Sequence, residues 1–188
     1  MTPLLLTPPA VEPLTLAEAK AWLRIDGAED DALVASLIGA APGLVEPAPP
    51  PPLIHHGCRI IRDGWPVDGR IPLPMAPVAE VTAVRVLDSA GLPAPVPATA
   101  YRLEALRDPP LVIVTGAVPL PGQALSGIEI DVIAGFGPAS QDVPEPLRHA
   151  VRLLLARWYE QRGDAAGDEL ALPGDIAALI GPYRRPRV

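Results

Sequence analysis

The stretch LTLAEAKAWLRIDGAEDDALVASLIGAA (14–41) predicts two short helices separated by a turn. Thr15 can cap the first helix, and Glu18, three residues later, completes a capping box. Asp26 and Gly27 supply the turn, and the acidic residues that follow favour the positive end of the second helix. Apolar residues then recur at the spacing of a core-facing helix. Nothing in this stretch has the pattern of a catalytic motif.

A second helical signal lies near the other end of the chain, in QDVPEPLRHAVRLLLARWYEQRGD (141–164). Asp142 is placed to cap this helix, and Pro144 stands near its first turn, where the missing N–H costs nothing. One broad apolar face runs along it, formed by Leu147, Ala150, Val151, Leu154, Leu155 and Trp158. A polar loop (163–169), a short helix and a basic tail are expected to follow.

Between these helical ends, the periodicity becomes that of strands. The β-branched runs are 59–65, 80–88, 100–105, 111–116 and 127–135, separated by Gly, Pro and Asp. The segment DSAGLP (88–93) predicts a hairpin turn, because Gly91 can adopt a positive φ. We therefore expect a small antiparallel sheet whose edges are guarded by proline. Ahead of it, the run PAPPPPL (47–53) predicts a polyproline II linker.

Composition limits the function. The chain has 188 residues, and only 4% of them are aromatic, so Ala, Leu, Val and Ile must build the core. A net charge of −7 disfavours a general nucleic-acid binder, whose affinity comes from cations. The N-terminal run MTPLLLTPPA lacks a basic region and is interrupted by proline, so we expect neither a signal peptide nor a membrane span. These features predict a soluble protein made in the cytoplasm.

Candidate catalytic and metal-binding residues are few. HHGC (55–58) places two histidines beside the single cysteine, but adjacent residues of a strand point to opposite faces. His149, the remaining histidine, lies far away in the sequence, so no metal site is predicted. Cys58 has neither an acidic residue to orient a histidine nor a Gly-rich turn. The sequence thus predicts no catalytic, cofactor or metal site and no enzyme.

The C-terminal tail is the strongest candidate for binding a partner. YRRPR (183–187) gathers Tyr183, Arg184, Arg185 and Arg187 at the end of an acidic chain. Arg and Tyr are favoured anchors of protein interfaces. Three arginines give little affinity for DNA at cellular salt, so DNA contact is the weaker interpretation. A frayed chain end with no binding role is the remaining alternative.

Three segments resemble the head–tail connector (adaptor) family of tailed phages. LLTPPAVEPLTLAEAKAWLRIDGAEDDALVASLIGAA (5–41) is similar to the opening of its members, including the Leu-Thr-Leu-x-Glu-Ala-Lys motif. IDVIAGFGPASQDVPEPLRHAVRLLLARWYEQR (130–162) resembles the second signature, which runs from a strand through Ala-Gly-aromatic-Gly to a helix ending in Trp-Tyr-Glu-x-Arg. ALIGPYRRPRV (178–188) is similar to the C-terminal segment. The central sheet fits longer members that carry a β-rich insertion.

From the residues, we expect an α+β fold in which the N- and C-terminal helices form one small bundle around an inserted antiparallel sheet. The expected division is 1–46 for the N-terminal helices of the bundle, 47–137 for the Pro-rich linker and β-rich insertion, and 138–188 for the C-terminal helices and tail. The Pro42–Gly43 pair is expected to end or kink the second helix.

The resemblance implies a structural subunit of a ring, typically a dodecamer, located between the portal and the stopper or tail of a phage, a prophage-derived particle or a gene transfer agent. DNA would pass through the ring without specific binding, past an acidic wall that repels phosphate. Such a subunit assembles in the host cytoplasm and ends in the neck of the particle, without contact to a membrane. The tail residues would dock on the portal. The alternatives are a monomeric interaction module that uses the polyproline run or the sheet, and an enzyme that uses Cys58 with His55 or His56.

Overall fold

The computed structural model describes residues 3–45, 52–161 and 172–184, and it has the predicted α+β composition. The chain divides into two compact units. One, called here the sheet unit, comprises residues 1–10 and 49–136, and the other, the helical unit, comprises 11–48 and 137–188. The polyproline run and the polar loop at 163–169 lie largely or wholly outside the described residues.

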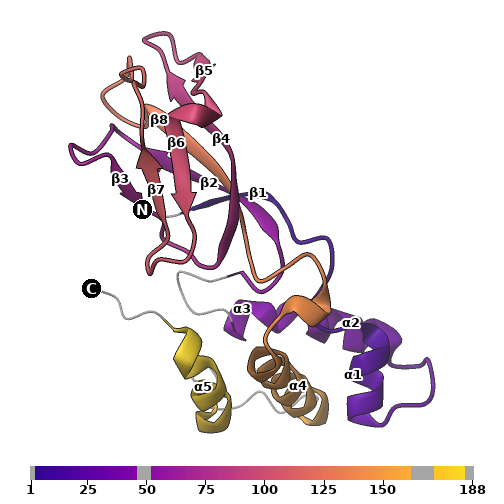
Figure 1. Ribbon diagram of the computed structural model, residues 1–188. Coiled ribbons are helices and arrows are strands. Elements are labelled where there is room, and N and C mark those ends of the chain that lie inside the picture. Colours follow the sequence, from indigo (N-terminus) through magenta and orange to yellow (C-terminus); the bar gives the residue numbers. More distant parts are fainter. Residues whose placement is uncertain (1–2, 46–51, 162–171, 185–188) are drawn as a thin grey trace. The chain divides into compact units, whose positions relative to one another are not determined.

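The helical unit is a small bundle built around one long helix (Figure 1). Its helices are α1 (Leu16–Leu23), α2 (Asp31–Ala40), α3 (Pro42–Val45), α4 (Glu145–Glu160) and α5 (Gly174–Ile180). Each of the other four contacts α4, so the N- and C-terminal helices share one bundle, as predicted. Its buried residues include Ala19, Val34, Ile38, Leu147, Ala150, Val151, Leu154, Leu155, Ile176 and Ile180.

Two details of the helix ends extend or correct the sequence analysis. The structure confirms that α2 stops before Pro42, which begins the short helix α3. Asp142 does not cap α4, because Pro144 occupies the N-cap position. Instead, Asp142 ends the 3₁₀ helix η2 (Ser140–Asp142), and its carboxylate accepts a hydrogen bond from the Ala139 N–H at 2.9 Å. The acidic side chain therefore stabilises the turn that leads into α4.

The sheet unit contains two antiparallel sheets rather than the single sheet expected. The five-stranded sheet has the order β1-β2-β8-β4-β5, and the three-stranded sheet the order β3-β7-β6 (Figure 1). The strands are β1 (Leu4–Thr7), β2 (His56–Arg62), β3 (Arg70–Pro72), β4 (Val78–Leu87), β5 (Pro93–Pro95), β6 (Tyr101–Glu104), β7 (Leu111–Val114) and β8 (Ile128–Ala134). The short 3₁₀ helix η1 (Ala98–Ala100) precedes β6.

Both sheets contribute to one hydrophobic core. Ile60, Val84 and Ile130 of the five-stranded sheet are buried in the same cluster as Ile71 and Val112 of the other sheet. Alternation places Ile128, Ile130, Val132 and Ala134 of β8 on the core side, while Glu129 and Asp131 take the opposite face. The core thus forms from aliphatic side chains, as the low aromatic content requires.

The first strand corrects the expected domain boundary. Residues 1–46 were expected to belong wholly to the bundle, yet Leu4–Thr7 pairs with β2 and lies in the sheet unit. All four residues of β1 are exposed, so the segment lacks the alternation of buried and exposed residues by which half-buried strands are recognised. The short strands β3 and β5 were also not predicted.

The hairpin between β4 and β5 confirms the prediction for residues 88–93. Gly91 has a φ of +80°, a conformation that glycine adopts without steric cost. The Asp88 carboxylate accepts hydrogen bonds from the backbone N–H groups of Ala90 and Leu92, at 2.8 and 2.9 Å.

Among the described residues, no helix is long and apolar enough to cross a membrane.

Candidate interaction site

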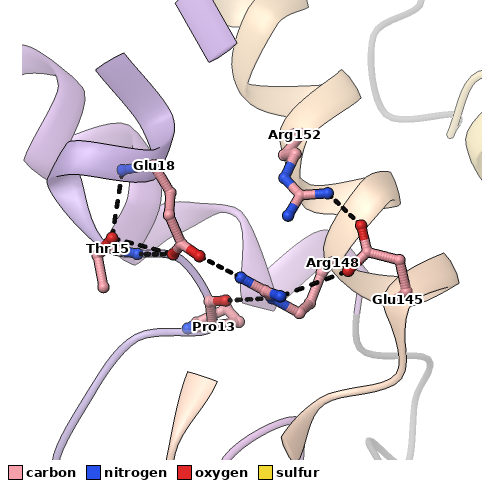
Figure 2. A network of polar contacts seen from close by, with 6 residues as sticks. All are labelled: Pro13, Thr15, Glu18, Glu145, Arg148 and Arg152. Atoms are coloured by element: carbon pink, nitrogen blue, oxygen red, sulfur yellow. Dashed lines mark hydrogen bonds and ion pairs between the residues drawn. The ribbon is translucent and has the colours of Figure 1, made fainter. Parts of the chain in front are cut away.

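The N-terminal signature forms the predicted capping box at the start of α1 (Figure 2). The Thr15 hydroxyl accepts a hydrogen bond from the Glu18 N–H at 3.2 Å, and the Glu18 carboxylate accepts one from the Thr15 N–H at 2.9 Å. Two backbone donors that the helix itself leaves unpaired are satisfied in this way. The Leu-Thr-Leu-x-Glu-Ala-Lys motif therefore begins the helix.

Arg148 of α4 joins this box to the C-terminal signature (Figure 2). Its guanidinium donates to Glu18 Oε1 at 2.5 Å, and its Nε contacts the Pro13 carbonyl oxygen at 3.4 Å. The Arg148 side chain is only 12% exposed. Glu145, one turn earlier, accepts from both Arg148 and Arg152. Residues 130 positions apart are thus bound to each other by charge-assisted hydrogen bonds, which are stronger than neutral ones.

The same contacts set the ionisation of Glu18. The Thr15 N–H lowers the pKa of Glu18 most, partial burial raises it, and the Thr15 hydroxyl and Arg148 lower it further, so that it lies below its ordinary value of 4.5. Bonds to Arg152 likewise lower the pKa of Glu145. Both carboxylates are therefore ionised near neutral pH and retain their cationic partners.

Two further contacts tie the signatures together within the helical unit. Lys20, the last residue of the N-terminal motif, forms an ion pair with Asp31 of α2 at 2.5 Å. Tyr159, in the Trp-Tyr-Glu segment of α4, donates its hydroxyl proton to Asp30 at 2.5 Å. Several of the polar residues that carry the resemblance thus connect one helix of the unit to another.

The glycines of the AGFG segment have a structural role too. Gly135 has a φ of +128°, and a Cβ at this position would lie 2.6 Å from the backbone of Ile54. A Cβ at Gly137 would lie 2.3 Å from the Asp142 side chain. The chain therefore packs closely at the exit of β8, where glycine avoids these contacts.

Comparison with solved structures identifies the relatives of this fold. The chain is 35% identical to a chain in the neck of an empty gene transfer agent (GTA) particle, computed with C6 symmetry, with a TM-score of 0.81. The match covers 100% of this chain and 97% of that one. The chain belongs to the family of gene transfer agent neck proteins. This confirms the resemblance to head–tail connectors that the three segments indicated.

Two other solved structures support the assignment of this chain to the family of neck proteins. A chain in the virion of a native GTA particle is 35% identical, with a TM-score of 0.76, and the match covers 100% of this chain and 97% of that one. A chain in the neck of a native GTA particle, computed with C12 symmetry, is 34% identical with a TM-score of 0.71, over 98% of this chain and 97% of that one. No protein-family model and no curated protein sequence matches the chain.

The structure of the neck protein describes only part of the predicted docking tail. Tyr183 ends the 3₁₀ helix η3 (Gly181–Tyr183), which follows α5 directly, and it is half-buried. Arg184 is exposed, and its N–H donates to the Gly181 carbonyl at 3.1 Å. Arg185 and Arg187 lie outside the described residues. The tail therefore starts from the last helix of the bundle.

His55, His56 and Cys58 belong to the sheet unit, and His149 belongs to α4 of the helical unit. Cys58 is 4% exposed and belongs to the core of the sheet unit. Burial lowers the pKa of His56, partly offset by a hydrogen bond involving the Ile54 backbone. Within the described ranges, no group of three or more His, Cys, Asp or Glu residues is arranged to hold a metal ion.

Sequence reasoning missed one polar cluster on the five-stranded sheet of the neck protein. Asp131 of β8 is only 6% exposed and accepts hydrogen bonds from Arg59 of β2 at 2.7 and 2.9 Å, and from Arg85 of β4 at 2.5 Å. Glu129, two residues earlier on the same face, pairs with both arginines. Burial alone would raise the pKa of Asp131, but the two arginines together hold it below its ordinary value. The alternation of Glu129 and Asp131 with apolar residues along β8 was the sequence signal that could have indicated this cluster.

Proposed function

We propose that this neck protein is an adaptor: a structural subunit that forms a closed ring between the portal and the stopper or tail of a GTA-like particle. The supporting observation is the full-length likeness, at 35% identity, to a chain from a GTA neck. A related neck was computed with C12 symmetry, which favours twelve copies in the ring. Subunits would assemble in the host cytoplasm and then occupy the neck.

The charge of the subunit fits a passage for DNA. Each copy carries 22 acidic and 15 basic residues, so its net charge is −7. An acidic wall repels the phosphate backbone, and DNA passing through the ring is then not retained by adhesion. In this proposal, the ring connects the head to the tail and lets DNA pass through, and it has no catalytic role.

We place the portal contact on the C-terminal tail, through Tyr183, Arg184, Arg185 and Arg187. This segment has three arginines within four residues and begins at Tyr183, the last residue of η3. Arg is enriched at interfaces because its planar group makes several hydrogen bonds at once. The tail is the most cationic segment of an acidic subunit, and it suits an acidic surface on the portal.

A truncation tests this placement. Deleting residues 183–188 is expected to lower the number of tailed particles by about tenfold or more, the change that corresponds to losing roughly 1.4 kcal/mol of binding free energy. Particles from a producer strain would be counted by electron microscopy, and the neck protein would be quantified on purified heads. Arg107→Ala, at an exposed arginine of the β6–β7 hairpin, is the matched control and should leave the count unchanged.

A second variant separates folding from docking. Changing Arg184, Arg185 and Arg187 together to Ala keeps η3 intact and should reduce attachment to the heads, with a stronger defect at higher salt. If truncated protein remained on the heads at the wild-type level, the tail would not be the portal contact. If the protein were dispensable for joining heads to tails, the adaptor proposal itself would fail.

A further inference from the structure

The five-stranded sheet of the neck protein ends in two exposed strands that carry no charge. At one edge, Leu4, Leu5 and Leu6 of β1 are 50%, 60% and 45% exposed. At the other edge, all of β5 is exposed, and Leu92 beside it is 65% exposed. Neither 3–8 nor 92–99 contains a charged residue, in a chain where 20% of residues are charged. Edge strands can be protected by charge, by proline or by being short, and at these two edges the protection does not come from charge.

The β5 edge is closed to strand addition in a specific way. The Val96 N–H donates to the Val84 carbonyl at 2.8 Å, so Val96 faces β4. Residues of a strand alternate in direction, and the neighbouring outward positions are Pro93, Pro95 and Pro97. Proline has no N–H to offer, so this edge can be covered by side chains but cannot extend the ladder. It is an apolar surface of fixed shape.

The β1 edge has the opposite character. Leu4, Leu5 and Thr7 pair with β2, and the register shifts between Leu5 and Thr7. The strand exposes all three of its leucines, and the nearest prolines, Pro3 and Pro8, lie outside it. Exposed apolar patches of this kind mark sites of protein contact. The two edges lie at opposite ends of the strand order β1-β2-β8-β4-β5. One subunit therefore presents two different apolar flanks.

From this arrangement we infer that the β1 edge of one copy packs against the β5 edge of the next copy. The inference rests on the proposed ring. A closed ring of identical subunits needs a heterologous contact, in which two different flanks of the subunit meet. Copies with a net charge of −7 repel one another, so contact is least costly where both flanks are uncharged. The leucines of β1 would cover residues 92–97 of the neighbouring copy.

Cysteine cross-linking tests the pairing in assembled particles. In a Cys58→Ala background, which removes the thiol next to Leu5 in the strand register, the double variant Leu5→Cys/Ala94→Cys would be treated with a short bis-maleimide. Purified particles should then yield a ladder of covalent multimers on a denaturing gel. Each single-cysteine variant should remain monomeric. Val67→Cys/Leu106→Cys, at two exposed positions in the β2–β3 and β6–β7 connections, is the matched control.

Charged substitutions test the same contact in a second way, which does not depend on the length of the cross-linker. Leu5→Lys and Ala94→Glu alone should each lower assembly by about tenfold. The double variant, which places opposite charges across the contact, should recover most of the loss. The edge pairing would be wrong if intact particles contained the neck protein but gave no ladder, and if the double variant did not restore assembly. The ring proposal would be unaffected by that result. Absence of the protein from the neck would instead overturn the ring.

Discussion

An Asp131→Ala variant is expected to lose about 3 kcal/mol of unfolding free energy, the size typical of removing one partner of a buried ion pair. Asp131 is 6% exposed and is the common acceptor for Arg59 and Arg85. Without it, two guanidinium groups face each other across β8, with only Glu129 to balance them. The arginines are partly exposed and can turn toward water, which keeps the loss at the lower end of the range.

Urea unfolding followed by tryptophan fluorescence measures this loss. Trp65 is the one tryptophan in the sequence of the sheet unit, so a Trp22→Phe/Trp158→Phe background reports on that unit alone. Glu104→Ala is the matched control, because its ion pair with Arg102 joins side chains that are 37% and 62% exposed. It should cost well under about 1 kcal/mol. Equal losses for the two variants would show that the cluster contributes no more than a surface pair.

Replacing Arg148 with methionine is expected to destabilise the helical unit by about 2 kcal/mol, as for charged hydrogen bonds in partly buried sites. Methionine keeps the apolar stem against the bundle but leaves Glu18 and the Pro13 carbonyl without their partner on α4. The loss would be measured by urea unfolding in a Trp65→Phe background, where Trp22 and Trp158 report on the helical unit. Arg157→Met, at an exposed position of the same helix, is the control.

The pH profile distinguishes the Arg148 contact from simple packing. The folded pKa of Glu18 is lowered, so its contribution to stability is present above its unfolded value near 4.5 and is lost as the pH falls through the folded pKa. Glu18→Gln should flatten this part of the profile. Arg148→Met should flatten it only partly, because the largest cause, the Thr15 N–H, remains. A wild-type slope in the Arg148→Met variant would contradict the ion pair.

The sequence predicts the helical unit well because its signals are local. Thr15 and Glu18 stand three residues apart, and the apolar face of α4 repeats within single turns. The contacts between the signatures could not be read in advance. Arg148 and Glu18 are 130 positions apart, and nothing local specifies which acidic residue an arginine on α4 will meet. The periodicity gives each helix its apolar face, whereas packing decides its polar partners.

The sheets were harder to predict for two physical reasons. The strand β8 pairs with β2 and β4, which are distant in sequence, so the Asp131 cluster depends on a strand order that no local pattern encodes. The edge strands β1 and β5 are short, exposed and bounded or occupied by proline, so they lack the alternation that marks a half-buried strand. The same features make them candidates for contact between copies.

The decisive measurement for the proposed adaptor ring is a density map of the neck of the particle at a resolution that shows side chains. We expect a closed ring of this chain between portal and stopper, with β1 of each copy against β5 of its neighbour and the C-terminal tail on the portal. A neck whose ring is built from another protein, or one in which copies of this chain make no contact with one another, would contradict it.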